Sequence, residues 1–247
     1  MVIGGVALAE VVLGVVAVSV EGVEGLAVAG PQEVGETMHA QDFFTPEEKE
    51  RIRQAVIAAE QRTSGEIVPM IVGASARYTE VELAGVIVGL VVGTLAALIW
   101  GDPWALLQLY LAWPLLGAAL GFIICCIPAI KRRLIPQRRI SEAVHLRSLA
   151  AFTAHGLHYT RAHTGILIFA SLFERRVQVL ADRGIDAKVQ PGTWDEVVNI
   201  LTSGLKSGDG CKGFCAAIER CGEILASHFP RSPGDRDELE DKLVSED

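Results

Sequence analysis

The sequence lacks charged residues over a long central stretch, where residues 83–130 contain a single one, Asp102. A helix in the core of a soluble protein normally keeps a polar face, so this stretch does not have the pattern of an ordinary amphipathic helix. A helix needs about 20 apolar residues to cross a hydrocarbon core of about 30 Å. The stretch is long enough for two, Leu83–Trp100 and Trp104–Ile130, with Gly101-Asp102-Pro103 as a turn between them. It is therefore predicted to form a transmembrane helical hairpin, and a buried hairpin of a soluble protein is the alternative.

The sequence also lacks the short motifs that mark common catalytic sites. It contains no Gly-x-Ser-x-Gly, P-loop, Rossmann fingerprint or zinc signature. The expected spans hold no Asp, Glu, Lys, Arg or His, whereas transporters and proton pumps place charges or broken helices near the membrane centre. The hairpin is therefore interpreted as an anchor, or as a docking surface for another helix through the small residues Gly85, Gly89 and Gly93.

Cysteines are few, and their spacing fits neither a disulfide framework nor a zinc site. Cys125 and Cys126 lie in the second expected span, and Cys211, Cys215 and Cys221 fall on an expected helix without C-x-x-C spacing. An odd number of cysteines favours reduced thiols in a cytosolic domain. Cys211 and Cys215 are four residues apart, which leaves a metal pair open, although small cysteines on a packed helix face are common.

Basic residues are concentrated directly after the uncharged stretch. The net charge is −8, so no global feature indicates a nucleic-acid partner. A cluster of basic residues beside a span marks its cytoplasmic side, and anchoring against anionic lipid headgroups is favoured over nucleic-acid binding. The residues predicted to set membrane orientation are Lys131, Arg132, Arg133, Arg138 and Arg139.

Residues 1–42 are predicted to be a poorly structured N-terminal arm. No Lys or Arg precedes Lys49, so the basic region of a secretory signal is missing. Glu10 and several glycines oppose insertion of residues 1–30 as a third span, which remains the alternative. Met38 is a plausible alternative start of the chain.

The residues before the hairpin predict one capped helix and one strand. In Thr45-Pro46-Glu47-Glu48, the threonine and the second glutamate form a capping box, and apolar residues recur at helical spacing up to Gly65. Glu66–Val72 is a short apolar run, typical of a buried strand. Pro69 removes a backbone donor and predicts a sheet edge or a bulge for this strand.

The residues after the hairpin predict the rest of one domain. Ser141-Glu142 begins a long helix, and an antiparallel hairpin follows. Its first strand, from Gly165, is apolar, and its second, Arg176–Ala181, alternates and is expected to have one wetter face. Thr193-Trp194-Asp195-Glu196 predicts a second capping box before two amphipathic helices. The strand before the membrane stretch must meet those after it, which requires an even number of spans.

This order of elements resembles the TPM domain family, and more narrowly the YgcG-related bacterial membrane proteins in which a transmembrane hairpin interrupts the domain after its first strand. The similar residues are the capped helix, Thr63-Ser64-Gly65-Glu66-Ile67-Val68, and the strand hairpin that turns at Glu174-Arg175-Arg176, within residues 43–239. The resemblance implies an α/β sandwich, a small mixed β-sheet flanked by helices. The expected parts of the chain are an arm (1–42), the domain in two pieces (43–82 and 141–230), the transmembrane hairpin (83–130), a basic juxtamembrane segment (131–140) and, from its charged and Pro/Gly-rich composition, an acidic tail (231–247).

Many members carry Gly-x-Gly-Leu-Glu after the strand hairpin, followed by an Asp, in a loop linked to binding of a divalent cation. Here the matching positions read Asp182-Arg183-Gly184-Ile185-Asp186, with Asp195 further along. Asp182, Asp186 and Asp195 are therefore candidate ligands for Ca²⁺ or Mg²⁺. The alternative is turn and cap chemistry for the same acids. His155 and His158 could share a helix face as a metal pair, with packing as the favoured alternative.

The resulting expectation is a multi-pass protein of the bacterial inner membrane with its folded domain on the cytoplasmic side. The lipid bilayer and a membrane protein are the expected partners. The expected function is that of an accessory or scaffold for a membrane protein complex, with no catalysis assumed. A metal-dependent, phosphatase-like hydrolase at the membrane surface is the alternative.

Overall fold

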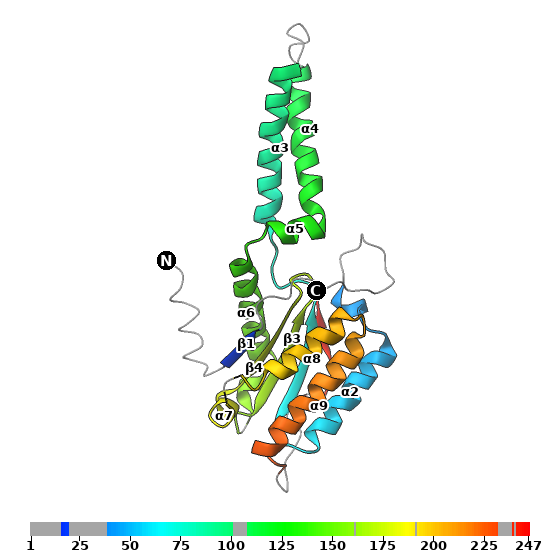
Figure 1. Ribbon diagram of the computed structural model, residues 1–247, viewed down its shortest axis with the longest axis vertical. Helices are drawn as coiled ribbons and strands as arrows, with labels where there is room; N and C mark the ends of the chain where they lie inside the picture. Colours follow the sequence, from blue (N-terminus) through cyan, green and yellow to red (C-terminus); the bar gives the residue numbers. More distant parts are fainter. Residues whose placement is uncertain are drawn as a thin grey trace. The chain divides into compact units, whose positions relative to one another are not determined.

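The computed structural model describes residues 16–19, 39–100, 108–160, 162–190, 192–231, 239 and 241–247. The chain forms two compact units, and each is described by itself. We call Met1–Ser75 together with Glu142–Asp247 the α/β domain, and Ala76–Ser141 the hairpin unit (Figure 1). The hairpin unit is inserted into the chain of the domain.

The α/β domain is built around a mixed sheet of five strands. These are β1 (Val16–Ser19), β2 (Glu66–Val72), β3 (Gly165–Ser171), β4 (Arg176–Ala181) and β5 (Val244–Glu246). They lie in the order β1-β4-β3-β2-β5 (Figure 1). β2 is parallel to β3 and to β5, and β4 is antiparallel to β3 and to β1. The predicted β3–β4 hairpin and its meeting with β2 are therefore confirmed.

Helices cover both faces of this sheet. On one face lie α2 (Pro46–Glu60), α8 (Asp195–Lys206) and α9 (Gly210–His228), and α6 (Gln137–Ala154) lies on the other (Figure 1). Three short turns complete the domain: η1 (Ala40–Asp42), η2 (Leu157–Tyr159) and α7 (Arg183–Asp186). The predicted α/β fold with a small mixed sheet flanked by helices is confirmed.

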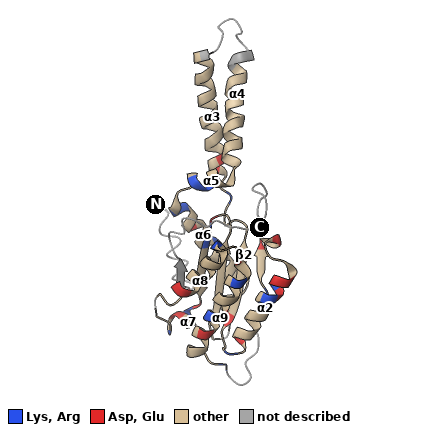
Figure 2. Cartoon of the chain, turned by 45° about the vertical axis from the view of Figure 1, so that its right-hand side comes forward, with Lys and Arg blue, Asp and Glu red and all other residues tan. Residues whose placement is uncertain are grey.

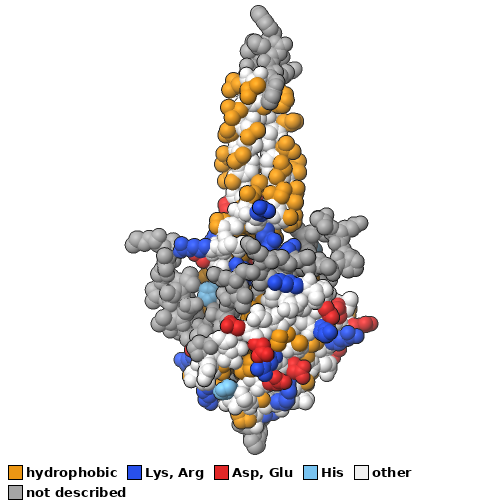
Figure 3. Space-filling model, in the orientation of Figure 1, with side chains coloured by type: hydrophobic (Ala, Val, Ile, Leu, Met, Phe, Trp, Pro, Cys, Tyr) orange, Lys and Arg blue, Asp and Glu red, His pale blue; other side chains and the backbone are white. Residues whose placement is uncertain are grey.

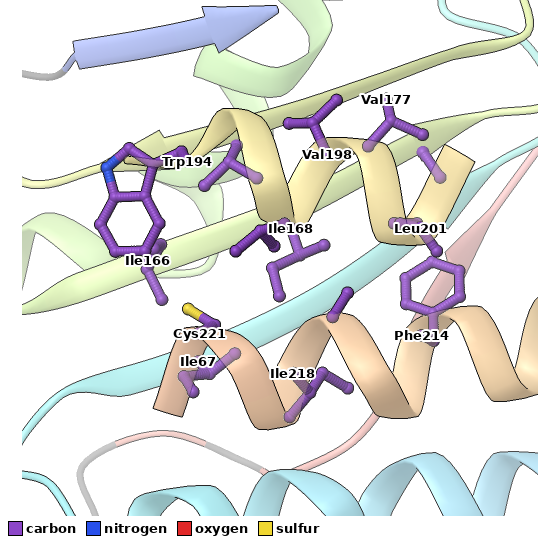
Figure 4. Close-up of a cluster of buried hydrophobic side chains, with 14 of the residues drawn as sticks. Ile67, Ile166, Ile168, Val177, Trp194, Val198, Leu201, Phe214, Ile218 and Cys221 are labelled. Carbon is purple, nitrogen blue, oxygen red and sulfur yellow. The ribbon is translucent and has the colours of Figure 1, made fainter. Parts of the chain in front are cut away.

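The main core lies between the sheet and the helices α2, α8 and α9. Alternate strand residues such as Ile166 and Ile168 point into the same apolar layer as Leu201 of α8 and Ile218 of α9 (Figure 4). All four are fully buried. Burial of such a side chain contributes about 1.5–3 kcal/mol, so this layer is the main source of the domain's stability.

The opposite face of β4 is polar but also buried. The Gln178 side chain accepts a hydrogen bond from the Ser148 hydroxyl at 3.2 Å and lies 3.0 Å from Nδ1 of His145, both on α6. All residues of β4 are buried. The alternation in its sequence had predicted a strand with one wetter face. That prediction is wrong, because α6 covers the polar side and supplies partners for Gln178.

β2 is paired with β3 along its whole length, but with β5 only over Met70–Val72. Alternate residues of a strand direct their amides to opposite sides. On the β5 side, the amide of Ile67 donates to the Glu60 carboxyl group at 2.7 Å, and the next outward position is Pro69, which has no N–H. No described strand pairs with this part of β2. The predicted edge position is therefore right for the first half of β2 and wrong for the second.

β5 belongs to the segment that was assigned to an acidic tail. Its Glu246 carboxylate lies 2.6 Å from the guanidinium of Arg147, and its backbone oxygen accepts from Gly73 at 3.0 Å. The next residue, Asp247, accepts from the Ala40 amide at 2.6 Å. The assignment of the whole segment to a tail is therefore wrong, because its last residues complete the sheet.

The N-terminal arm also contributes to the sheet. Val16–Ser19 form β1, which pairs with β4 from Val16 opposite Ala181 to Ser19 opposite Gln178. The expectation of a poorly structured arm is wrong for these four residues, which form a paired strand. Glu10 and Met38, on which other expectations for the arm rested, lie outside the described residues.

The two predicted capping boxes have different outcomes. Thr45 caps α2 as expected: its hydroxyl oxygen accepts from the Glu48 amide at 3.2 Å, and the Thr45 amide donates to the Glu48 carboxylate at 2.9 Å. The second box is absent. Thr193 donates its hydroxyl to the backbone oxygen of Gln190 at 2.7 Å, and α8 begins without a side-chain cap.

Candidate functional site

The hairpin unit consists of α3 (Thr79–Trp100), α4 (Gln108–Cys126) and α5 (Pro128–Leu134). α3 and α4 pack antiparallel through glycines. A Cβ atom placed on Gly89 would lie 2.1 Å from the backbone oxygen of Gly117, and one on Gly121 would lie 2.1 Å from that of Gly85. Glycine alone permits this approach of two backbones. The stripe of Gly85, Gly89 and Gly93 is thus used inside the hairpin, and its interpretation as a surface for another helix is wrong.

The outward surface of the hairpin is apolar. Only 17% of the most apolar 18-residue stretch of α3 is buried. Figure 3 shows apolar side chains over the outside of the hairpin. The single hydroxyl in the uncharged part of α3, that of Thr94, donates to the backbone oxygen of Leu90 at 2.8 Å and so needs no outside partner. Large apolar side chains at least 60% exposed occur on both helices: Leu83, Val88, Leu98, Ile99, Leu111, Leu115 and Leu116.

The second expected span is shorter than predicted. α4 ends at Cys126, and the axis of α5 turns by 90° from that of α4. The turn falls at Ile127, whose ψ of 119° is the extended conformation that a residue before proline prefers, and Pro128 opens α5. By length and composition α3 can cross a membrane alone, whereas the Leu111–Cys126 part of α4 is long enough only when it is counted together with Pro128–Leu134, from which it is bent by 90°. The expected turn at 101–103 lies outside the described residues.

Charges gather at one end of the hairpin unit. The ammonium of Lys131 lies 2.6 Å from the Glu82 carboxylate, and the guanidinium of Arg139 lies 3.5 Å from that of Glu80. Figure 2 shows basic residues on α5 and the long helices in the colour of uncharged residues. Two of the five residues predicted to set orientation are therefore paired with acids in the first turn of α3.

The three acids predicted as metal ligands have separate surroundings. Asp182 is buried, caps α7 by accepting from the Arg183 amide at 2.7 Å, and lies 3.1 Å from Nδ1 of His163. Asp186 and Asp195 are exposed. Within the described residues, no three His, Cys, Asp or Glu side chains are grouped to hold a metal ion. The structure thus does not bring the three acids together, and the cap on α7 and the contact with His163 account for Asp182.

The two histidines expected on one helix face do not share it. α6 ends at Ala154, and Gly156 follows in a left-handed conformation with φ of 72°. Nε2 of His155 lies 3.8 Å from the Glu246 carboxylate, whereas the ring of His158 lies against Tyr159 with centroids 3.9 Å apart. The chain reversal at the glycine separates their environments.

The cysteines of α9 are free thiols facing the protein interior. Cys211 and Cys221 are buried, and Cys215 is half-buried. Burial raises the pKa of the Cys211 thiol to about 11, and it raises the pKa values of the Cys215 and Cys221 thiols as well. A thiol acts as nucleophile or metal ligand in its deprotonated form, so these residues favour a packing role.

A buried carboxylate cluster was missed by sequence reasoning. Glu174, in the β3–β4 turn, accepts from the Ser75 amide at 3.0 and 3.1 Å and from the Ser171 hydroxyl. The Ser75 hydroxyl lies 3.1 Å from that of Ser171. The cluster lies at the carboxyl ends of two parallel strands, a common ligand position in α/β sheets. Here it fixes the loop that leaves β2, and its partners are separated in sequence by up to 99 positions, which explains why no local pattern indicated it.

A second missed contact joins α2 to the C-terminal segment. Burial, followed by a hydrogen bond to Asp241, raises the pKa of the Glu60 carboxyl group to about 10. The Glu60 carboxyl group also accepts from the Ile67 amide at 2.7 Å. This arrangement stabilises the segment that leads into β5.

Comparisons with known proteins support the fold and leave the function open. No family model and no curated protein matches the sequence. The chain is similar to the NMR structure of the BA42 protein from the psychrophilic bacterium Bizionia argentinensis, with 21% sequence identity and a TM-score of 0.53. The similarity covers 84% of this chain and 97% of that one. At this identity it shows the α/β fold alone.

Proposed function

We propose that the protein is an integral membrane protein in which the α3–α4 hairpin spans the bilayer and anchors the α/β domain. The supporting observation is the exposed apolar surface of both helices. Soluble proteins rarely expose a contiguous apolar patch of more than several hundred Å², because exposure of apolar surface to water is costly. In lipid the same surface has no such cost.

The lengths of the two helices support this proposal. α3 has 22 residues and α4 has 19. At about 1.5 Å per residue they measure about 33 and 28 Å, which matches a hydrocarbon core of about 30 Å. Because the hairpin is antiparallel, both of its ends lie on the same side, so the two pieces of the domain can join there.

The charges at the end of the hairpin support a cytoplasmic location for the domain. Lys131 and Arg139 lie beside Glu82 and Glu80 at the end where the chain enters and leaves the hairpin. Basic residues flanking a span are enriched on the cytoplasmic side. Together with the resemblance to YgcG-related proteins, this favours the bacterial inner membrane with the domain in the cytoplasm.

The role of the domain is proposed to be that of a TPM-like accessory or scaffold for a membrane protein complex. Three of its carboxyl groups are engaged with other polar side chains or amides: Glu174 with Ser75, Asp182 with His163, and Glu60 with Asp241. These contacts favour structural roles over catalytic ones. The hydrolase alternative gains no support from Asp182, whose carboxylate already caps α7.

Alkaline carbonate extraction tests the anchor. The wild-type chain is expected to stay in the membrane pellet. Two aspartates facing lipid, Leu95→Asp with Leu116→Asp, are each expected to cost about 2.5–3.5 kcal/mol of insertion and to move the protein to the soluble or aggregated fraction. The matched control is Leu146→Asp, an exposed leucine on α6 of the domain. Release of the wild-type protein by carbonate would contradict the anchor.

Photo-crosslinking in intact membranes tests the scaffold role. A photoreactive residue at Leu146, on the α6 face, is compared with one at the exposed Lys212 on the α9 face. A scaffold is expected to give one discrete adduct with a membrane protein, from one of the two positions. Absence of any protein adduct from both positions, in membranes that retain the chain, would argue against a scaffold and leave the anchor intact.

A further inference from the structure

The short helix α5 has the geometry of a helix lying in the membrane surface. It comprises Pro128–Leu134 and runs at 90° to α4. If α4 crosses the bilayer, as the proposed function holds, a perpendicular helix directly after it lies parallel to the membrane plane. Its depth is fixed by the end of α4, where the hydrocarbon core gives way to headgroups.

The side chains of α5 are distributed as this position requires. At 100° per residue, Ile130 and Leu134 fall on one side of the helix, Arg132 falls on the opposite side, and Arg133 falls at the boundary, about 60° from Ile130. Leu134 is 55% exposed, so its side chain is available to the apolar layer. A helix with one apolar and one basic side lies at the boundary between acyl chains and headgroups.

The ion pairs of the hairpin unit separate the basic residues into two groups. Lys131 lies 2.6 Å from the Glu82 carboxylate, and Arg139 lies 3.5 Å from that of Glu80. For Arg132 and Arg133, no described residue of the hairpin unit supplies a carboxylate within ion-pair distance. A guanidinium group presents a planar pair of donors that matches two phosphate oxygens. These two arginines thus carry charge suited to an anionic ligand at the depth of the headgroups.

We propose that α5 binds anionic phospholipids, with Arg132 and Arg133 contacting the headgroup phosphates and Ile130 and Leu134 in the acyl region. The inference rests on the proposed insertion of the hairpin, and it names a lipid class as a specific partner. A basic residue at an anionic surface contributes about 1 kcal/mol, which corresponds to about a fivefold preference for each arginine.

The test uses the full chain reconstituted in vesicles of phosphatidylcholine with 10% phosphatidylglycerol. The protein is extracted in mild detergent, and the lipids that remain bound are counted by mass spectrometry. The wild type is expected to retain phosphatidylglycerol enriched about fivefold or more over its share in the vesicle. Arg132→Gln with Arg133→Gln is expected to retain the two lipids in their vesicle ratio. The matched control removes two exposed charges from the domain, Arg51→Gln with Lys212→Gln, and is expected to behave as the wild type.

Carbonate-resistant flotation of the same samples separates this inference from the anchor. If both wild type and variant float, and only the wild type retains enriched phosphatidylglycerol, the result supports the lipid site. Flotation of both with equal lipid ratios overturns the site and leaves the anchor standing. If the wild type does not float with the vesicles, the result overturns the anchor.

Discussion

Replacement of Gly89 by alanine is expected to separate the two helices of the hairpin. The added Cβ would lie 2.1 Å from the backbone oxygen of Gly117, whereas a carbon and an oxygen in contact are about 3.3 Å apart. The helices must therefore move apart by about 1 Å at this level, because both contacting groups are backbone. Overpacking of this kind costs about 1–3 kcal/mol, which lowers the ratio of packed to open hairpin about 5- to 150-fold.

The native thiol of Cys125 reports this opening. Cys125 is buried against Gly85, and its neighbour Cys126 is exposed. In a Cys126→Ser background, the rate of maleimide labelling of Cys125 in detergent micelles, measured by peptide mass spectrometry, follows the open fraction. Gly89→Ala is expected to raise that rate by the same 5- to 150-fold. The control Val88→Ala, at a position 61% exposed, should leave it unchanged. Equal rates for Gly89→Ala and the parent would refute the glycine packing.

Four further predictions concern the α/β domain, in micelles of the full chain. Because the pKa of Glu60 is raised to about 10, its contribution to stability is fully present below about pH 4.5 and is lost as pH rises toward 10. The free energy of unfolding of Glu60→Gln, measured with denaturant between pH 5 and 9, should therefore depend less on pH than that of the wild type. Glu174→Ala leaves a buried amide and hydroxyl without their acceptor and should lower the unfolding free energy by about 1–3 kcal/mol. Leu201→Ala opens a cavity in the main core and should cost about 2–5 kcal/mol, and a smaller loss would contradict its burial. Alkylation of Cys211 in the folded protein should stay slow at pH 8 and accelerate as pH nears 11, whereas rapid reaction at pH 7 would contradict the raised pKa.

Local signals in the sequence predicted the parts of the fold that depend on local physics. The capping box at Thr45, the apolar run of β2 and the strand pattern after Gly165 each involve residues close in sequence, and each is confirmed. The insertion of a separate helical unit between β2 and the rest of the domain could also be predicted, because two long apolar runs follow one another in residues 83–130.

Features that depend on long-range contacts could not be predicted. β1 and β5 are four and three residues long, and each exists because a neighbouring strand offers it a paired edge. Gln178 alternates with apolar residues as if it faced water, yet α6 covers it. The glycine stripe of α3 showed that a backbone could approach closely, but not whether that backbone belongs to this chain or to another.

The candidate site shows the same division. Three acids near a turn, Asp182, Asp186 and Asp195, resemble a ligand set in sequence, but the capping geometry of Asp182 becomes visible only with the neighbouring His163 in place. The basic cluster after the hairpin was found, whereas the pairing of Lys131 and Arg139 depends on Glu82 and Glu80 in another helix.

The most direct test of the proposal that the hairpin spans the membrane is the sidedness of three single positions. Cysteines replacing Asp102 at the expected tip, Arg51 in the first piece of the domain and Lys212 in the second are labelled with a membrane-impermeant maleimide in spheroplasts, and each is read by peptide mass spectrometry. We predict labelling of position 102 in intact spheroplasts, and labelling of positions 51 and 212 only after the membrane is opened. Labelling of 51 and 212 on opposite sides, or of all three positions on one side, would contradict a two-span anchor that interrupts a single domain.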